Sequence, residues 1–356
     1  MKRLLILAVI TLSAAVHAQQ FISPQDKGLA YVGRWDFRTP NAPTCAFPGT
    51  QIHAQFEGST FALLLKPYSG YIMVKIDNEP IVKVNADRAD SIYIVNDELK
   101  DKMHRATITF CNEGMDLRPA FKGLLIEDGK ELGRRPVLPL RKIEIIGDSH
   151  TCGYGVEASS QHDHYTLANS NVYYSYASVM ARSLNAQVVI SARSGNGVYR
   201  NYSGPKEGNP NNMTAVWDRY NINDSLPRWD FSRYTPDVLC ITLGDNDCST
   251  KGYDIELLSK AYYKLYEGVR REYPETKIVF VSSPAMGGEG LKDQQETMAA
   301  IVSRINSEGD SKVSMFKSPT RDLNFPLGAD WHMGKQQQAT FARLLGNYIK
   351  GLMNWQ

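Results

Sequence analysis

Four polar clusters in the sequence carry side chains that together could perform nucleophilic catalysis. The first is Gly147-Asp148-Ser149, which directly follows an apolar stretch. A serine at a helix start exposes its hydroxyl to the positive end of the helix dipole, and its own N–H can donate to an oxyanion. Ser149 is therefore the candidate nucleophile. The alternative is an ordinary helix cap, because Ser and Asp oxygens accept the free N–H groups of a first helical turn.

The second and third clusters could supply hydrogen-bond donors to a developing oxyanion. Residues 194–197 read Ser-Gly-Asn-Gly, and residues 244–247 read Gly-Asp-Asn-Asp. Because it lacks a side chain, Gly195 lets its N–H approach a substrate oxygen, whereas Gly197 is expected only to shape the turn. The Asn246 amide would add a side-chain donor, worth roughly 2.7–4 kcal/mol in a comparable site. The alternatives are a loop glycine and an ordinary turn residue.

The fourth cluster could supply a general base. Residues 328–332 read Gly-Ala-Asp-Trp-His. His332 could take the serine proton and return it to a leaving alcohol, while Asp330 could bind the other imidazole nitrogen and fix its tautomer. A surface histidine before the last helix is the alternative interpretation. His150, next to the serine, is a rival base, but we expect its side chain to point elsewhere.

Metal and disulfide chemistry have weaker support. The two aspartates of residues 244–247 could bind a metal, but no clustered histidine or further acid accompanies them, and the second is expected to order its loop. The five cysteines form no CxxC pair, so we expect no zinc or redox site. Export would permit disulfides, and the sequence leaves Cys45 with Cys111 and Cys240 with Cys248 as open candidates.

The four clusters fall where a parallel sheet would bring them into one crevice. After about residue 140, short apolar strands alternate with segments of helical period. The predicted strands are 143–146, 188–190, 238–243 and 278–281, and the predicted helices are 255–272, about 291–306 and a last helix near the C-terminus. This alternation predicts an α/β fold, an open parallel sheet flanked by helices. Reactive groups gather at the carboxyl ends of such strands.

The first part of the chain has a different periodicity. β-Branched and aromatic segments with partial two-residue alternation predict strands at 50–56, 60–66, 71–77, 81–86, 91–97 and 105–111. With no long helical pattern between them, they predict a β-sandwich, in particular a jelly roll. A stretch with two prolines, residues 132–140, reads as a linker. We therefore expect a β-sandwich domain over 19–135 and an α/β domain over 136–356.

The N-terminus and the composition restrict localisation and partners. Residues 1–18 carry Lys2 and Arg3, an apolar core and small residues, which predicts a secretory signal peptide without a lipid-modified cysteine. The chain has a formal charge of +2, and those two residues account for the excess. A neutral mature chain without a basic cluster gives no support to nucleic-acid binding. No later apolar run approaches the length of a membrane helix.

The four clusters match, in order, the residues that name the SGNH (GDSL-type) hydrolases: Ser149, Gly195, Asn246 and His332. This resemblance covers about residues 140–356 and implies the flavodoxin-like sheet of that fold. With a sandwich ahead of it, the whole chain resembles carbohydrate esterase family 2. That family's SGxGxxRNY pattern is met by residues 194–202, and its Asp-Trp-His sequence by residues 330–332.

Two departures from the family patterns bear on the base. Broader SGNH enzymes place an aspartate three residues before the histidine, where this chain has Ala329, and Asp330 is only two before. The family 2 pattern allows this spacing, and some members are thought to use a backbone carbonyl instead of the carboxylate. The resemblance therefore leaves both arrangements open for His332. Met333 replaces the proline that usually follows, which changes the start of the last helix.

The resemblance implies a secreted or periplasmic serine esterase that removes O-acetyl groups from plant polysaccharides such as xylan or mannan. An acetyl-enzyme would form on Ser149, with no cofactor or metal, and the N–H groups of Ser149 and Gly195 with the Asn246 amide would hold the oxyanion. Trp331 and Tyr154 are the candidate contacts to acetylated polysaccharide or oligosaccharide. The alternatives are a lipase or thioesterase of the same fold, and a glycan-binding protein without turnover.

Overall fold

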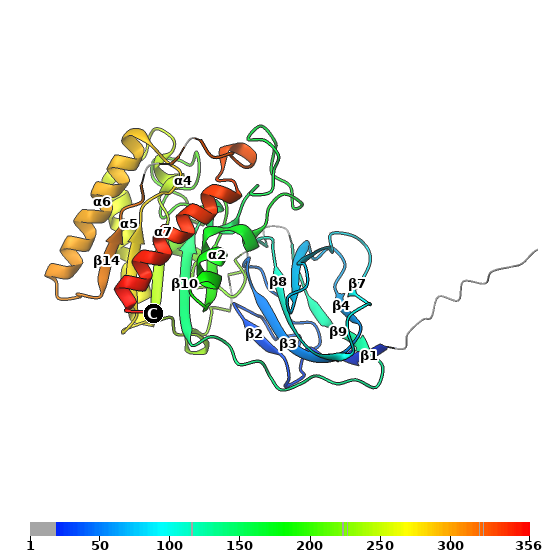
Figure 1. The fold of residues 1–356 in the computed structure, drawn as a ribbon. Helices are drawn as coiled ribbons and strands as arrows, with labels where there is room; N and C mark the ends of the chain where they lie inside the picture. Colours follow the sequence, from blue (N-terminus) through cyan, green and yellow to red (C-terminus); the bar gives the residue numbers. More distant parts are fainter. Residues whose placement is uncertain (1–18, 115–116, 223, 226, 320, 323) are drawn as a thin grey trace, which may run out of the picture.

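The computed structural model describes residues 19–114, 117–222, 224–225, 227–319, 321–322 and 324–356. The predicted signal peptide, residues 1–18, lies outside the described residues and stays a prediction. Figure 1 shows an all-β part beside an α/β part. Within the described ranges, no helix is both long and apolar enough to cross a membrane.

The all-β part is a sandwich of two antiparallel sheets, as predicted. One sheet has the order β1-β9-β4-β7 and the other the order β2-β3-β8-β5-β6. The strands are β1 (Gln19–Ile22), β2 (Ala30–Val32), β3 (Gln51–Gly58), β4 (Phe61–Leu65), β5 (Tyr71–Ile76), β6 (Val82–Asn85), β7 (Ile92–Asn96), β8 (Lys102–Phe110) and β9 (Phe121–Glu127).

Alternating burial explains the strands that the sequence predicted. In β3, Ile52, Ala54 and Phe56 are buried between the sheets, while the side chains between them face outward. The six predicted strands correspond to β3 through β8. The pattern gave no indication of β1, β2 or β9. The first two are short, and β9 is interrupted by Gly123, whose φ is +139°.

The α/β part is built on a five-stranded parallel sheet with the order β11-β10-β12-β13-β14. Its strands are β10 (Arg141–Gly147), β11 (Ala186–Ala192), β12 (Val238–Thr242), β13 (Lys277–Val281) and β14 (Val313–Phe316). In sequence order this is 2-1-3-4-5, the flavodoxin-like arrangement, so the predicted fold class is confirmed. The edge strand β14 was not predicted. The order reverses beside β10, and ligands bind at such a switch point.

Helices cover both faces of this sheet (Figure 1). The longer helices are α2 (Tyr176–Ser183), α5 (Ile255–Glu272), α6 (Gly288–Ser307) and α7 (Lys335–Met353), and the short ones are α1 (Ser149–Cys152), α3 (Met213–Val216) and α4 (Asp245–Cys248). On β10, Ile143 and Ile145 pack against α2 and α7, while Ile146 packs into the core formed with α5 and α6. Strands buried on both faces read as continuous apolar runs, which is why β10 to β13 were predicted.

A fully buried ion pair ties the sandwich to the centre of this sheet. Arg34, in the loop after β2, donates to the Glu144 carboxylate of β10 over 2.9 Å. Glu144 also accepts the Tyr273 hydroxyl over 2.7 Å and the Ser191 hydroxyl over 3.1 Å. The Arg34 guanidinium donates further to two main-chain carbonyls of the α/β part, those of Trp217 and Arg219. The two parts are therefore joined through buried charge.

The candidate disulfides are wrong, because all five cysteines are free and buried. Cys240 and Cys248 lie in the two different core clusters that cover opposite faces of the parallel sheet. Cys45 belongs to the sandwich core, whereas the Cys111 thiol donates to the Thr109 carbonyl over 3.6 Å. These residues act as small apolar side chains.

Candidate active site

The nucleophile and the base meet at the end of β10. The Ser149 hydroxyl lies 2.9 Å from Nε2 of His332. Asp148, not Ser149, caps the short helix α1, because its carboxylate accepts the His150 N–H over 3.1 Å. The serine hydroxyl is therefore left available for the imidazole. Ser149 is therefore not the helix cap, and its role as the nucleophile stays a prediction.

His332 is oriented by main-chain carbonyls. Its Nδ1 lies 3.1 Å from the carbonyl oxygen of Ala329 and 3.1 Å from that of Asp330. With Nδ1 as the donor, Nε2 is left as the acceptor that faces Ser149. The expectation that the Asp330 carboxylate binds this imidazole is wrong: Asp330 contacts His332 through its backbone only.

The conformation of the chain explains why the Asp330 carboxylate turns away. Asp330 and Trp331 have φ angles of +49° and +60°, in the left-handed region. The carboxylate instead accepts three donors: the Tyr154 hydroxyl at 2.8 Å, Nδ1 of His164 at 2.9 Å and the Tyr165 N–H at 3.1 Å. These contacts hold the turn that presents the base, so Asp330 supports His332 indirectly.

Tyr154, predicted as a substrate contact, packs against the base. Its ring stacks on the His332 imidazole with centroids 4.1 Å apart and an interplanar angle of 27°. Its hydroxyl is engaged by Asp330. The side chain also lines the cleft, so contact with substrate stays a prediction. Two other aromatic residues, Tyr199 and Trp217, are buried in the core of the α/β part.

A second histidine sits beside the base. His150 forms an ion pair with Asp245, Nε2 to Oδ2, at 3.2 Å, and its ring centroid lies 4.9 Å from that of His332. Burial opposes the charge on His150, but the Asp245 carboxylate outweighs it and raises the pKa of this histidine. Burial, followed by repulsion from His150, lowers the pKa of His332 to about 4. His332 is therefore neutral and able to accept a proton at neutral pH.

The loops after β11 and β12 place the predicted oxyanion donors beside this pair. Gly195 has a φ of +78°, a conformation that favours glycine, and lines the same cleft as Ser149. One N–H of the Asn246 amide donates to the Asn196 carbonyl over 2.9 Å, which ties the two loops together. The amide has a second N–H for an oxyanion.

Asp247 orders the loop after β11, whereas the sequence predicted that it orders its own loop. Its carboxylate accepts the main-chain N–H groups of Val198, Tyr199 and Arg200 over 2.8–2.9 Å. Burial raises its pKa to about 6 against these donors. The carboxylates of the 244–247 loop are therefore engaged by protein groups, and among the described residues no group of three or more acidic, His or Cys side chains could hold a metal.

The cleft above Ser149 has a volume of about 770 Å³. Its walls include Tyr202, Met286, Arg321 and Trp331. Trp331 is 53% exposed and meets the His162 ring edge to face, so about half of its surface is open to a ligand in the cleft.

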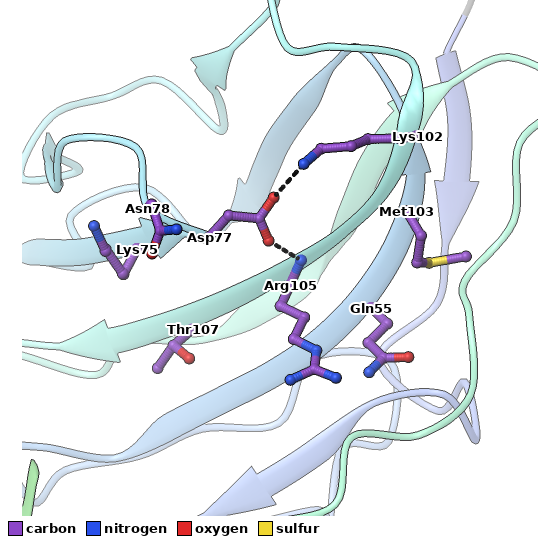
Figure 2. Close-up of a pocket in the computed structure, with 8 residues that line it drawn as sticks. All are labelled: Gln55, Lys75, Asp77, Asn78, Lys102, Met103, Arg105 and Thr107. Atoms are coloured by element: carbon purple, nitrogen blue, oxygen red, sulfur yellow. Dashed lines mark hydrogen bonds and ion pairs between the residues drawn. The ribbon is translucent and has the colours of Figure 1, made fainter.

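Another pocket, of about 660 Å³, lies on the outer face of the sandwich (Figure 2). Its one carboxylate, on Asp77, accepts the Arg105 main-chain N–H over 2.8 Å and lies 3.6 Å from the Lys102 ammonium. The residues that line it, all drawn in Figure 2, include no serine or cysteine beside a histidine. This pocket therefore lacks the pairing of hydroxyl and imidazole that the cleft of Ser149 presents.

Comparison with known proteins agrees with this geometry. A family model described as "Carbohydrate esterase 2 N-terminal" matches residues 31–136, and one described as "GDSL-like Lipase/Acylhydrolase family" matches residues 145–331. A solved family two carbohydrate esterase from Clostridium thermocellum, in complex with cellohexaose, has a TM-score of 0.86 and 32% identity, covering 92% of this chain and all of that one. The chain belongs to carbohydrate esterase family 2.

Two curated relatives of this family 2 member have named activities. The cellulase/esterase CelE of Acetivibrio thermocellus is 33% identical over 331 residues, which are 92% of this chain but only 40% of CelE. The chain thus spans less than half of that relative. An acetylxylan esterase/glucomannan deacetylase of Cellvibrio japonicus is 25% identical over 338 residues, 94% of this chain and 91% of that protein.

One residue of this family 2 site escaped the sequence analysis. Glu113, from the sandwich, is buried and accepts both the N–H and the hydroxyl of Ser194, next to Gly195. It lies in a short loop with no recognisable motif. Only the fold brings it beside the loop after β11. The His150–Asp245 pair was missed for the same reason, because the two residues lie far apart in sequence.

Proposed function

We propose that this protein is a secreted serine esterase that removes O-acetyl groups from plant polysaccharides. The observation that carries the proposal is the 2.9 Å contact between the Ser149 hydroxyl and Nε2 of His332 at the switch point of the sheet. Family membership and the named activities of relatives, on acetylxylan and glucomannan, support the substrate class. A neutral His332 suits the role of general base.

The first half of the reaction transfers the acetyl group to the enzyme. His332 takes the Ser149 proton as the hydroxyl attacks the acetyl carbonyl carbon. The N–H groups of Ser149 and Gly195 and the free N–H of Asn246 stabilise the oxyanion that forms. As the tetrahedral intermediate collapses, His332 returns the proton to the sugar oxygen, which leaves as a hydroxyl.

The second half hydrolyses the acetyl-enzyme. His332 takes a proton from water, whose oxygen attacks the acetyl carbon, and acetate leaves when the proton returns to Ser149. The two main-chain carbonyls at Nδ1 stabilise the imidazolium that forms twice in this cycle. Every proton is carried by Ser149, His332, the water and the sugar hydroxyl, so no cofactor is needed to balance the steps.

The cleft supports a glycan as the group that carries the acetyl ester. Trp331 presents a half-exposed ring next to the base, and sugar faces stack on such rings. Polar and apolar residues share the lining, among them Asn246, Arg321 and Met286. We assign acetylated xylan, mannan or related polysaccharides as the substrates, with Trp331 as the platform.

The test is acetate release from acetylated xylan, glucomannan and pectin by the wild type and by Ser149→Ala. We expect kcat/KM of the variant to fall by about 10⁴-fold or more, as for removal of nucleophiles in comparable sites, with an unchanged melting temperature. Ser307→Ala, on the exposed end of α6, is the matched control and should keep full activity. Unchanged acetate release by Ser149→Ala contradicts the assignment.

The same assay distinguishes the two alternative functions. A lipase or thioesterase would prefer long-chain p-nitrophenyl esters over p-nitrophenyl acetate. A glycan-binding protein would retain the polysaccharide without releasing acetate. Either result would replace the proposal.

A further inference from the structure

The sandwich reaches into the active site of the α/β part through one buried carboxylate. Glu113 follows β8 and has an exposed fraction of only 5%. Its Oε2 accepts the Ser194 N–H over 2.7 Å, and its Oε1 accepts the Ser194 hydroxyl. Ser194 immediately precedes Gly195, the predicted oxyanion donor. One carboxylate therefore binds both polar groups of the residue that leads into the oxyanion hole.

The same carboxylate contacts the element that carries the nucleophile. The Cys152 thiol donates to Oε2 of Glu113 over 3.7 Å. Cys152 is the last residue of α1, and Ser149 is the first. Glu113 thus lies behind both the nucleophile helix and the oxyanion loop, and links the two from the side opposite the cleft.

The loop that carries Glu113 is itself fixed on the sandwich. The Cys111 N–H donates to the Tyr71 carbonyl over 2.9 Å, and the Tyr71 N–H donates to the Asn112 side chain over 2.7 Å. On the other side, the Gly114 N–H donates to the Ala46 carbonyl over 2.7 Å. The loop that carries the Glu113 carboxylate is therefore held by hydrogen bonds within the β-sandwich on both sides of the residue.

Gly195 is held through its backbone and through its neighbours. Its carbonyl accepts the Tyr202 N–H over 2.9 Å, and a Cβ atom built on it would meet nothing within 4 Å. Its position therefore also depends on the residues on either side. Asn196 is held by Asn246 and by the Asn211 carbonyl, and Ser194 is held by Glu113. Glu113 thus fixes one of the two ends of the oxyanion donor.

The Glu113 carboxyl group binds three polar groups at once: the Ser194 N–H and the Cys152 thiol at Oε2, and the Ser194 hydroxyl at Oε1. Burial raises the pKa of Glu113, and the Ser194 and Cys152 donors with Arg193 oppose this shift. An amide in its place would keep one acceptor oxygen for the N–H and the thiol, and its NH₂ group would donate to the Ser194 hydroxyl oxygen, so glutamine conserves part of these contacts. Donors in an oxyanion hole stabilise a transition state only when they are held close to the productive geometry.

We propose that Glu113 is a positioning residue through which the β-sandwich sets the Gly195 N–H against Ser149. This proposal rests on the esterase function proposed above. It gives the first domain a role in the reaction itself, distinct from glycan binding and from shielding one side of the cleft. Glu113 acts through Ser194 and never touches the reacting atoms.

The test compares Glu113→Ala, Glu113→Gln and the control Lys83→Ala in the full-length chain. Lys83, on β6, crosses the same interface without holding the Glu113 loop, and donates to the Ala168 carbonyl over 2.6 Å and to the Glu157 carboxylate. The readouts are kcat and KM for acetate release, the inhibition constant of methylboronic acid, which forms a tetrahedral adduct with serine, and the melting temperature.

We expect Glu113→Ala to lower kcat by about 10- to 100-fold at nearly unchanged KM. The inhibition constant of methylboronic acid should rise by a similar factor. Glu113→Gln should recover part of both losses. Lys83→Ala should lower the melting temperature and leave both kcat and the inhibition constant of methylboronic acid near their wild-type values. A loss that appears only in the transition state and its analogue is not produced by a merely structural role.

Three results would overturn the proposal. The first is wild-type kcat and inhibition in Glu113→Ala or, should that variant not fold, in Glu113→Gln. The second is an equal loss in Lys83→Ala, which would indicate a general effect of the interface. The third is a loss confined to KM. Failure of the wild type to release acetate from any polysaccharide would instead contradict the proposed function, and so the two failures are distinguishable.

Discussion

Two ionic clusters lie at β10 and just past its end, and they differ in how far they are removed from solvent. At mid-strand, Glu144 and Arg34 are both fully buried, and the carboxylate receives donors from three different elements. Just past the strand end, the His150–Asp245 pair lines the open cleft beside His332. In each cluster one buried nitrogen, Nε of Arg34 and Nδ1 of His150, has no hydrogen-bond partner among the described residues.

The difference shows what each cluster does. The fully buried pair joins two domains, and its contribution to stability is lost when one partner is removed. The pair that borders the cleft acts on the pKa of its neighbour. Here the neighbour is His332, the proposed base, whose pKa His150 helps to lower. The buried charges thus serve stability in the middle of β10 and are proposed to serve chemistry just past its end.

The largest expected effect is at the interface cluster. Arg34→Met leaves the Glu144 carboxylate buried without its cation, which should cost about 3–5 kcal/mol in the free energy of unfolding. Urea denaturation measures this loss. Activity at neutral pH should persist in the folded fraction, because Arg34 lies outside the cleft.

The control for this variant removes both charges. Arg34→Met combined with Glu144→Gln should recover a large part of the lost stability, because no unpaired charge then remains buried. A single variant as stable as the wild type would contradict the view that this pair joins the domains.

An intermediate effect is expected at the catalytic cluster, in the pH profile. His332 must be neutral to act as base, so the wild-type kcat/KM should decline only as pH falls through about 4. In His150→Gln the repelling positive charge is gone while the Asp245 carboxylate, which favours protonation of His332, remains. The pKa of His332 then rises, and the acid limb moves to higher pH.

The double variant His150→Gln/Asp245→Asn separates charge from structure. It also removes the carboxylate, so the acid limb should return toward the wild-type position. If the acid limb of the pH profile does not move in His150→Gln, whether or not kcat changes, then the His150–Asp245 pair does not set the pKa of His332.

The smallest effect is expected at Asp330. Because main-chain carbonyls hold Nδ1 of His332, Asp330→Asn should lower kcat by about tenfold at most, far less than the roughly 10⁴-fold found where an aspartate binds the histidine directly. The asparagine can still accept from Tyr154 and keep the turn. Steady-state kinetics on an acetylated substrate measure the effect. A loss of 10³-fold or more in kcat would indicate that the Asp330 carboxylate takes part in catalysis after all.

Much of this site could be predicted from the sequence because it lies at the ends of apolar strands. Ser149, Gly195 and Asn246 each follow a strand whose continuous apolar run reveals it, and parallel topology then brings them together. The Ser149–His332 contact follows from that topology and the order of the clusters. The sandwich was predictable from the alternation in strands such as β3.

The missed features depend on side-chain direction and on contacts between domains. The Asp330 carboxylate turns away because two successive residues adopt positive φ, which no spacing rule reveals. Glu113 and Arg34 act only where the domains meet, and neither lies in a periodic pattern. The disulfide candidates failed because Cys240 and Cys248 face opposite sides of one sheet.

The anchoring of Glu113 has a consequence for anyone who wishes to shorten or recombine this protein. A gene fragment that starts at residue 136 encodes every group that touches the ester, and for that reason looks like a self-sufficient catalyst. It nevertheless omits Glu113, which we propose positions the loop that carries Gly195. Recombination of domains in such enzymes should therefore keep the β-sandwich and the α/β domain together as one unit.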